Sequence, residues 1–336
     1  MQNSIRIPPD QMKSEFVRIL IKNGFNKTRA EKCADIFTTN SLEGVYSHGV
    51  NRFPKFIENI HKGYIHPDAE PSLVVAAGAL EQWNGNLGPG PLNAVVAAER
   101  SMELSKNYGL GMVAIGNTNH WMRGGIYGWM AAKKGYVLIA WTNTEANMPA
   151  WGAKDFRIGN NPLVIAIPYG NEAIVLDFAM SQYSYGKLEQ YSLEGKRLPY
   201  PGGFDRNGTL TDSPDEILAT RRALPAGYWK GSGLSLLLDI LASILSGGLS
   251  TSQISVLGAE YALSQVFIAV GIKQLPNYPG IEKSIVGIIR DLKGSIPVDP
   301  DNPVRFPGEN TISIREQNRK DGIPVNKQVW RKILAL

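Results

Sequence analysis

A histidine and an arginine stand four residues apart in the segment 45–52, which reads VYSHGVNR. Ser47 is a residue type that caps helices, so the pattern predicts a helix that His48 opens, with Arg52 one turn further along the same face. A guanidinium can hold a carboxylate with two parallel hydrogen bonds, while a neighbouring imidazole exchanges a proton with a keto oxygen. The spacing therefore indicates a receptor for an α-keto acid. A capping histidine beside a surface arginine is the alternative that the pattern leaves open.

A second histidine, His120, follows an apolar segment at 111–116 that we expect to be a strand. It lies in a polar, glycine-containing loop, residues 116–125, and loops at strand ends often carry active sites in α/β proteins. A loop histidine that only bonds the backbone is the alternative. The remaining histidines, His61 and His66, flank a helix stop and lack the Cys, His or Asp spacing of a metal site. The sequence therefore predicts no metal.

Two segments have the character of sites for an anionic cofactor. Glycines surround Lys230 in the segment 227–233, where a helix begins, and a helix amino end with a lysine favours a pyrophosphate. Asp177 follows the apolar run 173–176, and a carboxylate in this place can accept hydrogen bonds from the ribose of a dinucleotide. If Asp177 meets the 2′-hydroxyl, it would repel the 2′-phosphate of NADPH, which favours NADH.

The usual dinucleotide-binding motif is not found in the sequence. That motif needs three spaced glycines between a strand and a helix. The nearest match, GPGPLN at residues 88–93, lacks the third glycine and contains two prolines. The sequence therefore disfavours a standard Rossmann fold.

The elements that must position these residues follow from apolar periodicity. Helices are predicted near both chain ends, at 8–23, 29–40, 50–63, 281–293, 311–320 and 326–336. The middle alternates strands at 73–77, 79–83, 111–116, 136–143, 163–168, 173–178 and 265–270 with helices at 92–108, 127–134 and 231–247. This outline predicts an α/β (α+β) fold, in which residues 1–75 and 291–336 form a helical lobe with the substrate-binding helix and residues 76–290 form an α/β domain.

Composition excludes several classes of protein. The chain has 336 residues, of which 43% are hydrophobic and 19% charged, so it can bury a large core and is neither disordered nor fibrous. Its net charge of +5 is spread thinly, and the densest basic groups are only Arg221–Arg222 and the mixed segment 315–320. A nucleic-acid binder would concentrate that charge. The mild basicity suits an anionic small molecule instead.

Cysteine content and hydropathy predict a cytoplasmic protein. The lone cysteine, Cys33, allows no internal disulfide and fits a reducing compartment. Residues 1–6 lack the apolar stretch of a secretory signal. The most apolar run, 234–245, is interrupted by Asp239 and is shorter than the roughly 20 residues that cross a bilayer. We therefore expect no membrane segment.

Five motifs in this order resemble those of a known family. They are the segments 45–54, 119–125, 151–154, 158–162 and 227–231. The chain is similar to the malate/L-lactate dehydrogenase family from about residue 10 to its carboxyl end. The resemblance implies an atypical, non-Rossmann NAD(P)-binding domain with a mixed sheet, a cytoplasmic homodimer and no metal.

The resemblance also implies roles for single residues. His48 corresponds to the general acid, and Ser47, Arg52 and His120 correspond to substrate-binding positions. Cofactor-binding stretches correspond to Ala173, Ile174, Val175, Leu176, Asp177, Phe178, Ala179, Trp229, Lys230, Gly308, Glu309 and Asn310.

The activity that the resemblance implies is reduction of a 2-oxo acid, most simply a 2-oxo sugar acid, by hydride transfer from NADH, with NADPH possible. A malate, lactate or ureidoglycolate dehydrogenase of the same family shares all the catalytic parts. A non-catalytic protein that binds sugar acids is the alternative from another class.

Overall fold

The computed structural model describes residues 4–336, and its centre is a seven-stranded mixed sheet. The strands follow the order β2 (Ser72–Ala77), β3 (Leu80–Asn84), β4 (Leu110–Thr118), β12 (Leu263–Val270), β5 (Val137–Thr142), β8 (Leu163–Tyr169) and β9 (Glu172–Phe178). Only β3 and β4 run parallel, and α4 (Gly90–Tyr108) makes the crossover that a parallel pair needs. All other neighbours are antiparallel. The predicted mixed α/β fold without a Rossmann sheet is confirmed.

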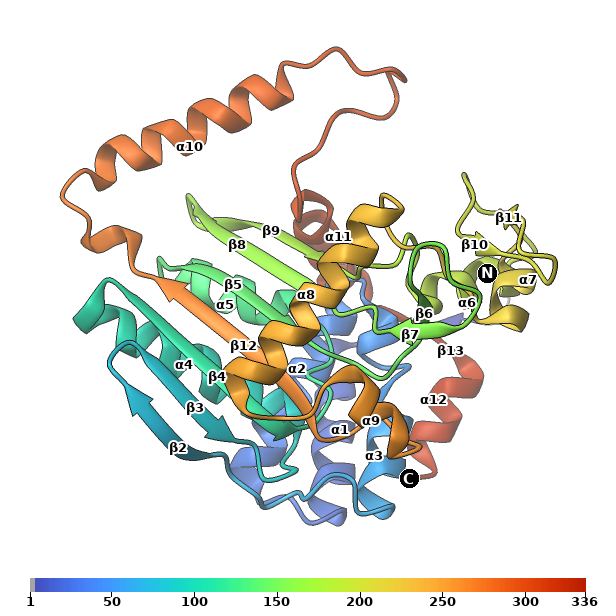
Figure 1. Cartoon of the computed structure of the whole chain (residues 1–336), viewed down its shortest axis with the longest axis horizontal. Coiled ribbons are helices and arrows are strands. Elements are labelled where there is room, and N and C mark those ends of the chain that lie inside the picture. Colours follow the sequence, from blue (N-terminus) through green and yellow to red (C-terminus); the bar gives the residue numbers. More distant parts are fainter. Residues whose placement is uncertain (1–3) are drawn as a thin grey trace.

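Helices cover both faces of this sheet (Figure 1). On one face α4 and α5 (Gly125–Lys133) pack their alanines against the strands, and Trp121, Tyr127 and Phe267 fill the layer between them. On the other face lies α8 (Trp229–Ser246), whose Leu238 and Ala242 contact Val266 and Trp141. The central strands β12 and β5 are therefore largely buried, whereas the edge strand β2 is exposed at all six positions.

A helical lobe combines the two ends of the chain. Its helices are α1 (Pro9–Lys22), α2 (Lys27–Leu42), α3 (Phe53–His61) and α12 (Lys327–Leu334), and β1 (Ser4–Ile7) pairs with β13 (Ile323–Asn326). Phe16 stacks on Phe53 with ring centroids 4.0 Å apart, and Phe37 meets Phe53 edge-on at 5.1 Å. Trp330 and Ile333 from the carboxyl end belong to the same core. The prediction of a lobe built from both chain ends is confirmed, whereas its limits at residues 75 and 291 stay a prediction.

Two parts of the chain lie outside these layers. A small unit of α6 (Tyr185–Leu193), β10 (Gly203–Phe204), β11 (Leu210–Thr211) and α7 (Pro214–Thr220) has its own core of Leu188, Leu198 and Ile217. The helix α10 (Tyr278–Lys293) stands apart from the body as an arm, and a long segment returns from it to α11 (Glu309–Asp321) (Figure 1). The small unit was not predicted, because its strands are only two residues long.

The remaining elements are short. They are η1 (Tyr46–His48), β6 (Met148–Pro149), β7 (Phe156–Ile158), α9 (Thr251–Val256) and η2 (Ile272–Gln274). Among residues 4–336, no helix combines the length and the apolar character needed to cross a bilayer.

Candidate active site

A cleft of about 920 Å³ opens between the helical lobe, the sheet and the small unit that contains α6. Its walls come from η1 and the start of α3, the loop between β4 and α5, the end of β9, the amino end of α6 and the turn before α11. Pockets of several hundred Å³ are typical of small-molecule and cofactor sites. This cleft is therefore the candidate active site.

Two histidines lie face to face in this cleft. The rings of His48 and His120 are 5.6 Å apart between centroids and inclined by 22°. The Nδ1 of His120 accepts a hydrogen bond from the backbone N–H of Met122 at 2.9 Å, so a neutral His120 carries its proton on Nε2. The backbone bond that the sequence offered as an alternative is thus present, and it leaves Nε2 as a donor. The turn that makes it holds Met122 at φ 68°, a conformation costly for a side chain of this size.

The local fold around His48 differs from the prediction. His48 ends the short 3-10 turn η1, and α3 begins only at Phe53, with Arg52 as its N-cap residue. The prediction that Ser47 caps a helix opened by His48, with Arg52 one turn further on, is therefore wrong. The cause is Gly49, where a Cβ would lie 2.2 Å from the Oγ of Ser41 on α2. That close approach pins the chain to α2 and interrupts the helix.

The predicted substrate residues nevertheless meet in the cleft. Ser47, His48, Arg52 and His120 all line it, and the Oγ of Ser47 lies 3.0 Å from the Nδ1 of His48. The Nη2 of Arg52 pairs with the Oε2 of Glu260 at 3.2 Å. Sequence reasoning missed Glu260, because it stands in an irregular segment more than 200 residues away. The roles of the four predicted residues stay predictions.

Burial and positive charge keep both histidines neutral. Burial, together with the guanidinium groups of Arg52 and Arg123, lowers the pKa of His48 to about 4. Burial, with the charge of Arg52 next, lowers the pKa of His120 well below its ordinary value. An anion that enters the cleft would offset the guanidinium charges and favour a protonated histidine. The cleft is therefore suited to take up a proton together with an anionic ligand.

Asp177 is engaged with the protein itself. Its Oδ2 accepts a hydrogen bond from the N–H of Gly125 at the start of α5, at 2.7 Å, and lies 3.8 Å from the Nε of Arg123. Arg123 in turn pairs with the buried Glu43, whose Oε1 also accepts from the Nε of Arg315 at 2.8 Å. This buried network joins α2, the loop that carries His120, and α11.

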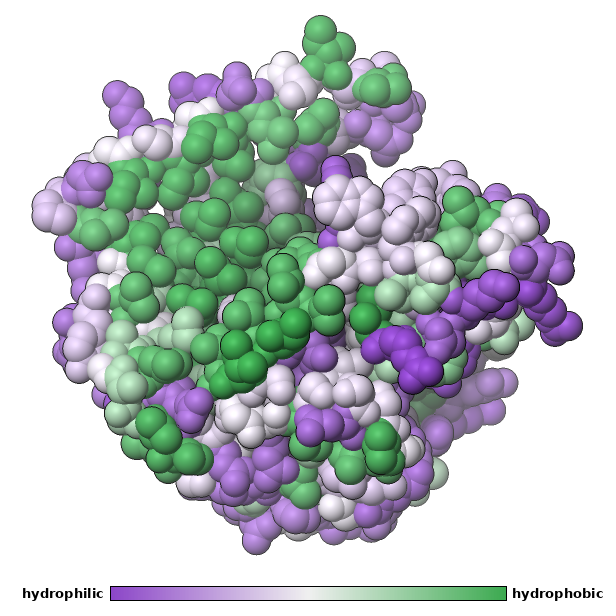
Figure 2. Space-filling model, viewed as in Figure 1, coloured by the Kyte–Doolittle hydropathy of each residue, from purple (hydrophilic) through white to green (hydrophobic). Residues whose placement is uncertain are grey.

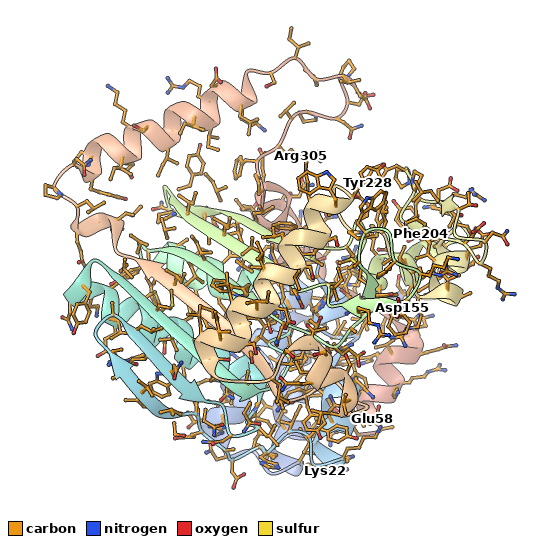
Figure 3. The ribbon with its side chains drawn as sticks, in the orientation of Figure 1. Lys22, Glu58, Asp155, Phe204, Tyr228 and Arg305 are labelled. Carbon is orange, nitrogen blue, oxygen red and sulfur yellow. The ribbon has the colours of Figure 1, made fainter. Side chains whose placement is uncertain are left out.

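Some of the predicted cofactor-binding residues line the cleft, and the others lie outside its lining. Val175, Asp177, Phe178, Ala179 and Gly308 line the cleft. The other members of the strand segment, Ala173, Ile174 and Leu176, are absent from the lining as the structure describes it. Trp229 and Lys230 open α8 beside Tyr228, which Figure 3 labels at the outer end of that helix, and the Trp229 side chain is 65% exposed. Glu309 is bonded to Lys293 and to the backbone of Phe306, and Asn310 follows it in the first turn of α11.

Polar residues to which the sequence assigned no role complete the lining of the cleft. Thr144, Glu145 and Asn147 follow β5, and Asn160 precedes β8. Asn147 donates through Nδ2 to the Oδ1 of Asn160 at 2.9 Å, and its own Oδ1 has no partner among residues 4–336. The motif 158–162 was a signal for Asn160, although the sequence assigned it no role. Residues of α6 gave no signal, because only the tertiary structure brings that helix to the cleft.

Comparison with known proteins identifies the family. The family described as malate/L-lactate dehydrogenase matches residues 7–334. The chain is 44% identical over 333 residues to the 2,3-diketo-L-gulonate reductase of Escherichia coli O6:K15:H31, covering 99% of this chain and all of the relative.

Solved structures agree in fold over the whole chain. Malate dehydrogenase from Entamoeba histolytica superposes with a TM-score of 0.92 at 26% identity, covering 98% of this chain and 96% of that one. Sulfolactate dehydrogenase from Methanocaldococcus jannaschii does so with a TM-score of 0.88 at 26% identity, covering 99% and 98%. The resemblance read from the sequence is confirmed, and the family supports a nicotinamide cofactor. The chain belongs to the malate/L-lactate dehydrogenase family and is an oxidoreductase.

Proposed function

We propose that this protein reduces 2,3-diketo-L-gulonate to 3-keto-L-gulonate with NADH, using His48 as the general acid. The observation that carries the proposal is the meeting of His48, His120 and Arg52 in one cleft. The 44% identity to a 2,3-diketo-L-gulonate reductase over nearly the whole chain supports the choice of substrate.

Arg52 and His48 have different roles around the carbonyl that is reduced. A bound nicotinamide cofactor supplies the hydride. Arg52 holds the carboxylate of the substrate, a charge-assisted contact worth roughly 1.5–3 kcal/mol. That carboxylate offsets the guanidinium charge near His48, which can then take up a proton and deliver it to the oxygen of the reduced carbonyl. Such acid catalysis contributes on the order of 10²–10⁴-fold.

Ser47 orients the general acid, and His120 helps to bind the substrate. Ser47 fixes the ring of His48 through the contact between its Oγ and Nδ1. His120 presents an Nε2–H donor, since its Nδ1 is occupied by the backbone of Met122. We assign this donor to a second oxygen of the substrate, next to the carbonyl that is reduced.

The cleft has features that fit a nicotinamide cofactor. The unpartnered Oδ1 of Asn147 is an acceptor suited to the carboxamide N–H₂ of a nicotinamide. The end of β9 and Gly308 would hold further parts of the cofactor, and Trp229, Lys230, Glu309 and Asn310 would contact its outer end. Five carboxylates line the cleft, from Glu145, Asp177, Glu189, Glu194 and Glu260. They outnumber the four cationic side chains of the lining, from Arg52, Lys55, Arg123 and Arg221, so the cleft disfavours an additional phosphate, and we therefore propose NADH over NADPH.

Loss of NADH absorbance with three acids tests the proposal. We expect the highest kcat/KM with 2,3-diketo-L-gulonate and lower values with oxaloacetate and pyruvate. Preference for oxaloacetate or pyruvate would identify a malate or lactate dehydrogenase instead, and NADH binding without turnover of any 2-oxo acid would indicate a binding protein. Repeating the assay with NADPH decides the cofactor.

We also propose that the protein is a cytoplasmic homodimer, joined through α8 and α10. Figure 2 shows apolar residues gathered across the face that carries these helices. Exposed members include Leu236, Leu237, Ile240 and Ile244 of α8 and Ile288 of α10. An apolar patch of this extent usually marks an interface, and α10 has only Ile289 buried. Light scattering should give twice the chain mass, and Ile244→Lys should give a monomer.

A further inference from the structure

A second cavity of about 320 Å³ adjoins the cleft behind Arg52 and His120. The two spaces share six lining residues, namely Arg52, Lys55, His120, Met122, Glu145 and Glu260. The smaller space is also lined by Asn59, in the last turn of α3, and by Tyr64, in the loop that follows this helix. A ligand held by Arg52 therefore has room to extend past His120.

The charges around this second cavity balance. Arg52 is paired with Glu260, and both Lys55 and Lys62 are paired with Glu58, the Lys55 contact being 2.9 Å. Glu145 adds a further carboxylate to the lining. With Glu58 included, the three cations of the lining (Arg52, Lys55 and Lys62) face three carboxylates, so the region has no net positive charge to hold a second carboxylate of a ligand. Uncharged groups such as hydroxyls suit this environment better than another anion.

Two residues that line this cavity have acceptor atoms with spare hydrogen-bonding capacity. Asn119 lines the second cavity and is 1% exposed. Its Nδ2 donates to the backbone oxygens of Tyr64, Leu87 and Gly88, whereas its Oδ1 has no partner among residues 4–336. Glu260 uses only Oε2 in its ion pair with Arg52. Acceptors of this kind are satisfied by hydroxyl donors.

We infer that the second cavity receives the hydroxylated end of the substrate and that Asn59 and Glu260 select long, hydroxylated monocarboxylic 2-oxo acids. This inference rests on the proposed function. The volume corresponds to roughly ten waters at ~30 Å³ each, which is ample for three carbons and three hydroxyl groups. Glu260 and Glu145 would repel the second carboxylate of oxaloacetate. A three-carbon acid would leave the cavity filled with water.

Asn59 offers the sharpest test, because it lines the second cavity and is not part of the cleft lining. We expect Asn59→Phe to fill the cavity and lower kcat/KM for 2,3-diketo-L-gulonate about tenfold or more, while kcat/KM for pyruvate stays within about twofold. Asn59→Ala, the matched control, enlarges the cavity and should change both values less than about threefold. If pyruvate is not turned over, its inhibition constant against the six-carbon acid serves the same comparison.

The charge is tested by Glu260→Gln, which keeps the shape of the side chain. We expect kcat/KM for oxaloacetate to rise about tenfold relative to pyruvate. An equal loss with both acids in Asn59→Phe, or no loss with either, would overturn the inference, and so would an unchanged preference in Glu260→Gln. A wild-type protein that reduces none of these acids would instead refute the proposed function, so the two failures can be told apart.

Discussion

The low pKa of His48 makes a specific prediction for the pH dependence of kcat/KM in the direction of reduction. The kcat/KM measured for the oxo acid depends on the protonation state of the protein before that acid binds. General-acid catalysis requires that His48 is protonated in that state. With a pKa of about 4, set by burial and by Arg52 and Arg123, the protonated fraction falls about ninefold between pH 5 and pH 6. A histidine with its ordinary pKa near 6.5 would lose only about 1.3-fold over the same interval.

The assay is the initial rate of NADH oxidation at low oxo-acid concentration, corrected for the acid lability of NADH. We expect kcat/KM to fall steadily as the pH rises from 5 to 8, by about tenfold per pH unit. The apparent pKa in kcat should be higher, because the bound carboxylate offsets the guanidinium charges. The variant Arg123→Gln, which removes one of those charges, should raise the pKa seen in kcat/KM. A flat kcat/KM between pH 5 and 6 would refute the reasoning.

Three further predictions concern single side chains. His48→Gln should leave NADH binding intact, measured by fluorescence, and lower kcat on the order of 10²–10⁴-fold; full activity would transfer the acid role to His120. Arg52→Lys should raise KM for carboxylate substrates about tenfold with a smaller change in kcat, because an ammonium cannot reproduce the two parallel hydrogen bonds; a KM within about twofold of the wild-type value would contradict the carboxylate contact. Glu43→Gln should lower the free energy of unfolding by about 3–5 kcal/mol in urea titrations, since it removes the buried carboxylate that Arg123 and Arg315 share and leaves them only Asp177 at 3.8 Å and Glu172 at 3.2 Å. The matched control Asp155→Asn breaks an exposed pair with Arg157 and should cost less than about 1 kcal/mol, and equal costs in the two variants would show that the buried network adds nothing.

Local sequence was sufficient for most of the regular elements and for the family. The strand at 173–178 and the helix at 231–247 were predicted within a few residues of β9 (Glu172–Phe178) and α8 (Trp229–Ser246), because side-chain periodicity is a property of neighbouring residues. The motifs around His48 and His120 were enough to indicate 2-oxo acid chemistry and the family, since residue types and short spacings carry that information.

The tertiary structure decided how those parts are arranged. β12, from late in the chain, lies between β4 and β5, and the small unit with α6 closes one side of the cleft. Gly49 interrupts the predicted helix because it touches Ser41, and Arg52 meets Glu260 across more than 200 residues. The contact of Asp177 with the N–H of Gly125 at the start of α5 also comes from the tertiary structure, while its predicted contact with a ribose stays a prediction. Each of these outcomes depends on contacts between residues distant in the chain, whose energies no local pattern contains.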